Sequence, residues 1–132
     1  MKIGMFANIW NGLDIEEIFR IMVDNSIFYT QFNMSCVGEN TIPDKIDYNK
    51  INYIMKCCNK SGIKLSAISG TFNIILEDND YFLRFRNLVR ISKLLQIPCI
   101  TICTGTMNEK NMWKYDPRNS SNEAWERMLI AV

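Results

Sequence analysis

Residues 51–73 read INYIMKCCNKSGIKLSAISGTFN and pass from a helical pattern to a strand pattern. The apolar side chains before Gly62 recur at the three- and four-residue spacing of one helix face: Ile51, Ile54, Met55 and Cys58. Ser61-Gly62 predicts the end of this helix, because glycine readily adopts the left-handed conformation found there. The apolar run 63–69 then has the length of a buried strand. The stretch therefore predicts a helix followed directly by a strand.

The same alternation extends over the whole chain. Apolar runs predict strands at 2–7, 27–34, 63–69 and 98–103. Helical patterns begin after Asp14, before Ile51, at about Asp78 and at Ser120. Strands separated by single helices imply parallel neighbours with right-handed crossovers. The fold class is therefore α/β with parallel β/α repeats, either a doubly wound open sheet or the N-terminal half of a (β/α)8 TIM barrel.

The two later helices have faces that can be assigned from the sequence. In the helix over 78–95, Phe82, Phe85, Val89 and Ser92 are predicted to point inward, and a solvated basic face is predicted at Arg84, Arg86, Arg90 and Lys93. The last helix should open at Ser120, with its apolar stripe at Trp125, Met128, Leu129 and Val132. No glycine stop follows that stripe. We therefore expect residues 1–132 to form one partial barrel domain, truncated after four strand-helix units, which self-associates or lacks its C-terminal half.

Charge and apolar content indicate which partners and which location to expect for this protein. Fifteen basic residues stand against fourteen acidic ones, so the net charge is +1 and no broad field would attract nucleic acid or an anionic membrane. The first residues contain Asn8 and Asn11 where a signal peptide would be apolar, and no membrane-length apolar segment follows. We expect a cytoplasmic protein that binds neither nucleic acid nor a membrane.

The cysteine and histidine content limits the disulfide, metal-binding and catalytic chemistry that this chain can have. The cysteines are odd in number and lack the spacing of a disulfide framework, so we interpret all of them as reduced core residues: Cys36, Cys57, Cys58, Cys99 and Cys103. The chain has no histidine. This removes the commonest general base, the commonest zinc ligand and any histidine-activated nucleophile.

Polar residues gather where the predicted strands end, which is where parallel α/β folds bind their ligands. The candidate substrate-binding residues are Asn8, Asn33, Ser69, Thr71, Asn73, Thr104 and Gly105. Uncharged groups of this kind can hydrogen-bond sugar hydroxyls or phosphate oxygens. Asn, Ser, Thr and Gly are also ordinary turn residues, and both interpretations stay open. Trp113, in the loop after the fourth strand, is either a stacking surface for a sugar ring or a packing residue.

Four segments carry a family resemblance: Ser69-Gly70-Thr71-Phe72-Asn73, the run 100–106 (ITICTGT), Asn111-Met112-Trp113, and the run 119–125 (NSSNEAW). Together they resemble the sugar phosphate isomerase and epimerase family with the xylose isomerase-like barrel, over essentially the whole chain. The resemblance implies a metal-assisted proton transfer between adjacent sugar carbons. It also implies a divalent metal (Mn, Co, Mg or Zn) in the complete barrel, held mainly by later strands, and no metal site within this chain.

Two positions depart from the family pattern. The family often has histidine after the Ser-Gly-Thr-Phe-Asn segment and before the proline of the fourth loop, where this chain has Glu77 and Asp116 nearby. We interpret Glu77, Asp78 and Asp80 as the start of a helix, favoured by its dipole. Glu109 and Asp116 are interpreted as solvated loop charges. No catalytic residue is assigned.

Three functions follow from these observations. The first is a sugar or sugar-phosphate isomerase or epimerase, to which this chain supplies the substrate-binding half. The alternative is a non-catalytic half-barrel that binds a ligand or a partner chain. A third, phosphodiester chemistry as in apurinic-site endonucleases, is disfavoured by the near-neutral charge and the lack of histidine.

Overall fold

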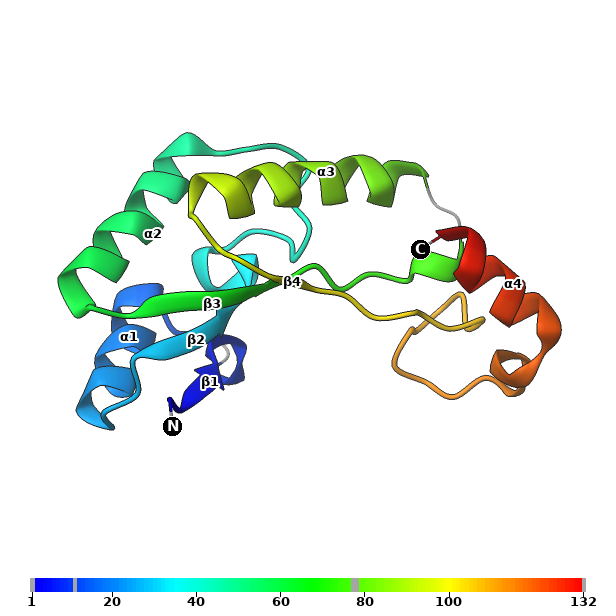
Figure 1. Ribbon diagram of the computed structural model, residues 1–132, viewed down its shortest axis with the longest axis horizontal. Coiled ribbons are helices and arrows are strands. Elements are labelled where there is room, and N and C mark those ends of the chain that lie inside the picture. The colour runs from blue at the N-terminus through cyan, green and yellow to red at the C-terminus, as the bar shows by residue number, and fades with distance from the viewer. Residues whose placement is uncertain (1, 11, 77–78, 132) are drawn as a thin grey trace.

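The computed structural model describes residues 2–10, 12–76 and 79–131, and strands and helices alternate along them (Figure 1). The strands and α-helices are β1 Gly4–Phe6, α1 Ile15–Asp24, β2 Tyr29–Phe32, α2 Tyr48–Ser61, β3 Lys64–Ser69, α3 Asn79–Leu94, β4 Ile100–Thr101 and α4 Asn122–Ala131. Short 3-10 helices are η1 Ala7–Ile9, η2 Met34–Val37, η3 Ile74–Leu76 and η4 Pro117–Ser120. The predicted residues Glu77, Asp78 and Val132 lie outside the described ranges.

The sheet is parallel and its strands follow sequence order, β1-β2-β3-β4. Gly4 pairs with Tyr29, Tyr29 with Lys64, and Ile68 with Ile100. A register shift interrupts the pairing of β2 with β3 between Thr30 and Gln31. A doubly wound sheet would reverse its strand order among the first four strands. This order contains no such reversal, and the prediction of an α/β fold with parallel β/α repeats is confirmed.

The predicted start of α1 and the predicted end of α2 are confirmed, and the start of α2, which was not predicted, has a similar cap. Asp14 precedes α1 and its carboxylate accepts the backbone N–H of Glu16 at 2.9 Å. Asp47 does the same for α2, accepting from Asn49 at 2.9 Å. Gly62 ends α2 with φ +73°, the left-handed conformation that the sequence predicted.

One face of the sheet carries the core. Phe32 and Ile68 are fully buried and share a cluster with α1 and α3 side chains such as Phe19, Leu88 and Ile91. Alternate residues of β2, Tyr29 and Gln31, point to the opposite face and are only half-buried. Because no described helix covers that second face, it stays open in this chain.

The inward faces of the later helices differ from the prediction. In α3 the buried side chains are Leu88 and Ile91, with Ser92, while Val89 is exposed, so the inner face is rotated by about one residue. In α2 the core position is Cys57 rather than Met55, which is exposed. Only Arg86, Arg90 and Lys93 of the predicted basic face are exposed, because Arg84 is half-buried.

The chain beyond β4 departs most from the prediction. α4 lies away from α1–α3 and packs on η3 instead of on the sheet (Figure 1). Its buried residue is therefore Ala124, and the predicted stripe residues Trp125 and Leu129 are exposed, Trp125 by 61%. Pro117 opens η4 and delays the helix, so Ser121 rather than Ser120 caps α4, accepting the Ala124 N–H at 3.2 Å.

The cysteines are free thiols among the described residues. Cys36 and Cys57 are buried, as expected, and burial raises the pKa of Cys58 to about 11. Cys99 is exposed, so its assignment to the core is wrong: it lies between Pro98 and the first residue of the edge strand β4. None of the helices in the described part of the chain is long and apolar enough to cross a membrane.

Candidate functional site

A cavity of about 530 Å³ opens at the carboxyl ends of the strands, and we call it the carboxyl-end cavity. Its walls come from the loops that follow β2, β3 and β4 and from the first turns of α3. Its polar lining includes Asn40, Thr41, Thr71, Asn73, Asn108 and Asn111. Amide and hydroxyl groups from three loops thus converge on one space.

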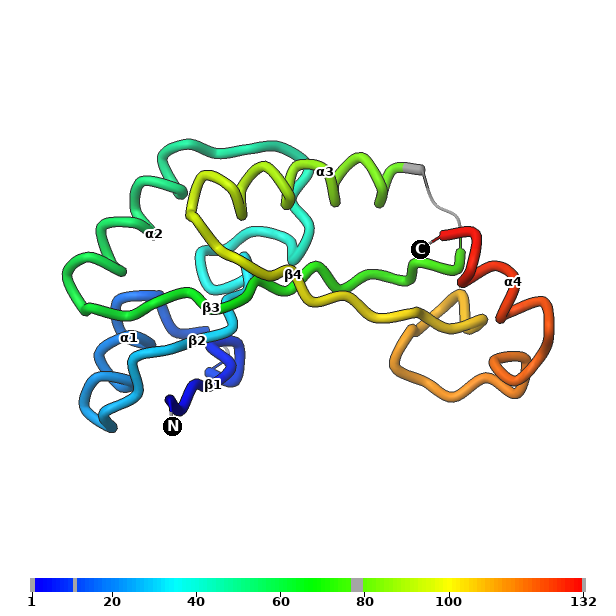
Figure 2. The backbone as a smooth tube through the Cα atoms, in the orientation of Figure 1, coloured from blue at the N-terminus to red at the C-terminus, as the bar shows by residue number. Residues whose placement is uncertain are grey.

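Asn73 joins the third and fourth loops at the edge of this cavity. Its side-chain Nδ2 donates to the Thr106 carbonyl oxygen at 2.9 Å, and its Oδ1 accepts the Thr106 N–H at 2.8 Å. The segments after β3 and β4 run side by side at this point (Figure 2). Gly105 has φ +86°, and a Cβ there would collide with Asn73 Oδ1. Glycine is therefore required by both the backbone conformation and the neighbouring amide.

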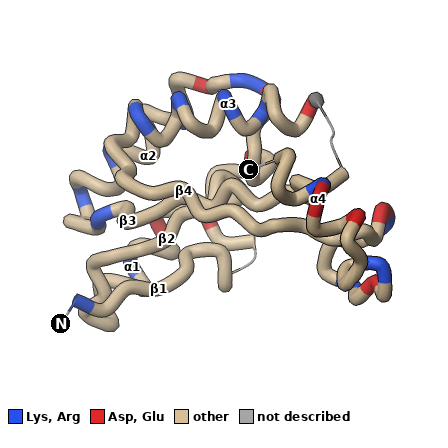
Figure 3. Tube along the Cα trace, turned by 45° about the vertical axis from the view of Figure 1, so that its right-hand side comes forward, with Lys and Arg blue, Asp and Glu red and all other residues tan. Residues whose placement is uncertain are grey.

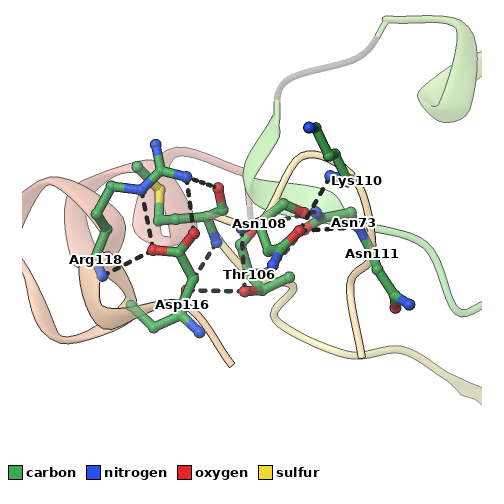
Figure 4. A network of polar contacts seen from close by, with 9 residues as sticks. Asn73, Thr106, Asn108, Lys110, Asn111, Asp116 and Arg118 are labelled. Atoms are coloured by element: carbon green, nitrogen blue, oxygen red, sulfur yellow. Dashed lines mark hydrogen bonds and ion pairs between the residues drawn. The ribbon is translucent and has the colours of Figure 1, made fainter. Parts of the chain in front are cut away.

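A polar network continues from Thr106 into the loop before α4 (Figure 4). Asn119 Oδ1 accepts from Thr106 Oγ1 at 2.9 Å and from the Met107 N–H at 2.8 Å. Arg118 Nη2 donates to the Met107 carbonyl oxygen at 2.6 Å and pairs with Asp116 at 2.8 Å. The Arg118 guanidinium beside Asp116 lowers the pKa of that carboxyl group. These contacts close the loop 106–119 on itself, and we call them the loop network.

The prediction that Asp116 is a solvated loop charge is wrong. Only 8% of Asp116 is exposed, and its carboxylate accepts both the backbone N–H and the Nε of Arg118, at 2.9 and 3.0 Å. An isolated carboxylate would be costly to bury, and the paired guanidinium offsets that cost. Asp116 therefore has a structural partner in its own loop.

Asn8 and Asn33 meet at the ends of β1 and β2. Ser35 Oγ donates to Asn8 Oδ1 at 2.7 Å, and the Ser35 N–H donates to Asn33 Oδ1 at 2.9 Å. Thr41 Oγ1 also donates to Asn33 Oδ1, at 3.3 Å, and Thr41 lines the carboxyl-end cavity. Asn33 is buried as the cap of η2, so its amide oxygen organises the wall behind the cavity.

The remaining predicted site residues are divided between locations. Thr71 lines the carboxyl-end cavity with Asn73. Thr104 and Gly105 line a separate cavity of about 210 Å³ next to α4, together with Trp125. Trp113 is 77% exposed and lines neither cavity. The structure thus brings Asn33, Thr71 and Asn73 toward one space and leaves Thr104 and Trp113 outside it.

Two features of this end were missed by sequence reasoning. Gln31 Nε2 donates to Ser69 Oγ at 3.1 Å and to Thr101 Oγ1 at 2.7 Å, so one amide bridges β2, β3 and β4 on the open face of the sheet. The alternation of Tyr29, Gln31 and their neighbours in a short strand was the available signal. Arg84 and Tyr81 line the cavity from α3, and no local pattern distinguishes them from surface residues.

A larger groove lies elsewhere and is not the better candidate. It has a volume of about 600 Å³ and is lined by α1 and α2 side chains, among them Phe19, Val23 and Lys60. Its walls are side chains of two packed helices, and none of the described strand-end loops after β2, β3 and β4 lines it. We therefore assign the candidate site to the carboxyl-end cavity.

The residues of this site do not fit a catalytic divalent metal. Such an ion needs three or four converging carboxylate, imidazole or thiolate ligands. Among residues 2–10, 12–76 and 79–131, no three Asp, Glu, His or Cys side chains lie close enough to hold one. The lining offers amides and hydroxyls instead, which are suited to hydrogen-bonding a hydroxylated ligand.

Comparison of the chain with protein-family models, with curated proteins and with solved structures gave no match. The case for a function therefore depends on the geometry of the carboxyl-end cavity.

Proposed function

We propose that this chain supplies the substrate-binding half of a sugar or sugar-phosphate isomerase or epimerase with a TIM-barrel fold. The observation that carries the proposal is the carboxyl-end cavity, where Thr71, Asn73 and Asn108 converge at the ligand-binding end of a parallel sheet. The family resemblance of the strand-end segments points to the same substrate class.

The sheet supports the barrel half of the proposal. Consecutive parallel strands in the order β1-β2-β3-β4, with helices on one face, are the repeat from which a (β/α)8 barrel is built. The other face would then be the barrel interior. Gln31, Ser69 and Thr101 form a hydrogen-bonded layer across three strands on that face, a position at which barrels stack inward-pointing side chains.

The chemistry of the lining supports binding more than catalysis. Proton transfer between adjacent sugar carbons needs a positioned base. Glu109 is the only carboxylate among the described residues that line the cavity, and it is exposed. The hydroxyl of Thr71 and the amide of Asn111 can contact sugar hydroxyls without the cost of burying a charge.

The alternative, a non-catalytic half-barrel that binds a ligand or a partner, is favoured by one specific observation. The described lining of the cavity comes from loops and the first turns of α3 within this one chain, so a ligand has polar contacts here without a second half. The first function predicts sugar binding together with a catalytic partner segment, whereas the alternative predicts binding of a ligand or a partner chain without catalysis.

Titration of the purified chain with neutral aldoses and ketoses and with their phosphomonoesters, followed by NMR chemical shifts, tests the proposal. We expect at least one sugar to shift amides around Thr71 and Asn111. Thr71→Val should weaken that binding by about three- to tenfold, the usual value of one lost hydrogen bond. Thr104→Val, in the separate cavity, is the matched control and should leave binding unchanged. If no sugar binds, or if both variants lose affinity equally, the proposal is wrong.

A further inference from the structure

Arg84 is the most deeply placed cation of the carboxyl-end cavity, and its charge is already paired. Its Nε lies 2.7 Å from Asp44 Oδ1, and its Nη2 lies 2.8 Å from Asp80 Oδ2. The angle at Nε falls short of a hydrogen bond, so the contact with Asp44 is an ion pair, and Nε has no access to solvent. Two carboxylates from different elements therefore occupy one side of the guanidinium.

That side is the one with which arginine holds phosphate. Bidentate recognition uses two parallel N–H groups of the guanidinium, such as Nε and one Nη. At Arg84 the atoms Nε and Nη2 face Asp44 and Asp80. A phosphate could take this position only by displacing a carboxylate that is already in place.

The wider charge of the cavity leads to the same conclusion. Besides Arg84, the described lining contains Lys110 and Glu109, both exposed. With Asp44 and Asp80 this makes two basic and three acidic groups. Basic and acidic positions alternate over α4 and the loop before it (Figure 3). α3 is more basic, but of its cations only Arg84 lines the cavity among the described residues. A phosphomonoester carries nearly two negative charges at neutral pH and would meet no net positive field here.

We infer that Asp44 and Asp80 are specificity-determining residues that neutralise Arg84, so that the cavity accepts an uncharged sugar and rejects its phosphomonoester. This inference rests on the proposed function and narrows its substrate class. The polar lining of Thr71, Asn73 and Asn111 remains available for hydroxyl groups. Tyr81, which contacts Phe72 and Arg84, adds an apolar wall for the carbon side of a sugar ring.

The inference is tested with the double variant Asp44→Asn/Asp80→Asn of the full chain, titrated with neutral sugars, their phosphomonoesters and inorganic phosphate. We expect the unaltered chain to bind a neutral sugar more tightly than its phosphomonoester. The variant should bind phosphomonoester and inorganic phosphate on the order of tenfold more tightly than the unaltered chain, because two negative charges next to Arg84 are removed. Its affinity for the neutral sugar should change little.

A matched control is available on α1, where Arg20 lies between Glu17 and Asp24 at 4.0 and 3.3 Å. Glu17→Gln/Asp24→Asn changes the net charge equally and should leave phosphate binding unaltered. Circular dichroism of both variants reports whether the Asp44–Arg84 tie between loop and helix is needed for folding. If the Asp44/Asp80 variant does not fold, Asp80→Asn alone should give a smaller gain in the same direction.

Each outcome decides a different point. Tighter binding of the phosphomonoester by the unaltered chain would overturn the inference and leave the proposed function standing. An equal gain in the α1 control would also overturn it, because bulk charge would then explain the effect. Failure of every sugar and phosphate to bind the unaltered chain would overturn both.

Discussion

The sheet with α1–α3 and the segment from Thr104 to α4 are held together by different forces. In the first region, Phe19, Phe32 and Ile68 are packed in a dry core. In the second region, fewer apolar side chains such as Met107 and Ala124 are buried, and the loop network of Thr106, Asp116, Arg118 and Asn119 adds polar contacts. Apolar burial is cooperative, whereas a network of a few polar contacts can open locally. The candidate cavity lies between the two regions, so its shape depends on the weaker one.

The largest effect is expected from the apolar region. Phe32 is fully buried in β2, and Phe32→Ala should lower the free energy of unfolding by about 3–5 kcal/mol, through lost burial and the cavity left behind. Urea denaturation followed by circular dichroism measures this. Phe28→Ala removes the same side chain at a position that is 42% exposed and should cost about 1 kcal/mol or less. Similar losses for the two variants would contradict the assignment of the core face.

The second-largest loss of stability is expected at Gly105, next to the contact of Asn73 with Thr106. Gly105→Ala and Gly62→Ala both place a side chain at positive φ, which costs about 1 kcal/mol each. At Gly62 the Cβ would point into open space, whereas at Gly105 it would push the Asn73 amide away from Thr106. Gly105→Ala should therefore cost about 2 kcal/mol or more, since the hydrogen bonds to Thr106 are lost as well.

Hydrogen exchange distinguishes the two glycine variants further. Gly105→Ala should speed exchange of the Thr106 N–H, while Gly62→Ala should act on the carboxyl end of α2. Equal effects on Thr106 would show that Asn73 does not join the two loops.

A smaller effect, confined to the loop network, is expected from pH. Arg118 lowers the pKa of Asp116 below its ordinary value of 3.8. A carboxyl group with a lowered folded-state pKa contributes stability above its unfolded value, and the contribution is lost as the pH falls below 3.8 toward the folded value. The carboxyl carbon signal of Asp116 in NMR should therefore titrate below 3.8, and Arg118→Gln should move the midpoint upward. An unchanged midpoint in Arg118→Gln would refute the pairing.

The smallest effect is expected at the surface of α4. Glu123 and Arg127 form an exposed pair at 2.9 Å, one helical turn apart. Glu123→Gln should change the free energy of unfolding by about 0.3–0.5 kcal/mol, because solvent screens such pairs. Thermal unfolding of this variant and the unaltered chain measures the difference. A loss as large as that of Gly105→Ala would mean that this exposed pair, rather than the packing of α4 on η3, holds α4 in place.

The parts of the fold that sequence reasoning predicted are those with local causes. Asp14 and Gly62 mark helix ends through contacts made within a few residues, and both were found where expected. The inner faces of α3 and α4 depend on what each helix packs against, so Val89 and Trp125 were assigned to the wrong side. The strand-end position of Asn73 was visible in the sequence, but its partner Thr106 lies 33 residues away. The position of Arg84 in the cavity wall was not predicted, because its ion pair with Asp44 joins α3 to the loop after β2, 40 residues earlier in the chain.

The side-chain amide of Asn73 satisfies both main-chain hydrogen-bonding groups of Thr106, beyond the last paired residues of β3 and β4. It accepts the Thr106 N–H and donates to the Thr106 carbonyl oxygen, as a neighbouring strand would. A side chain reaches farther than a backbone, so the two segments diverge here without losing their connection. The length of the Asn73 side chain thus determines the distance between the two segments at this edge of the carboxyl-end cavity. Substitution at that single position could reshape the entrance while the strands below keep their register.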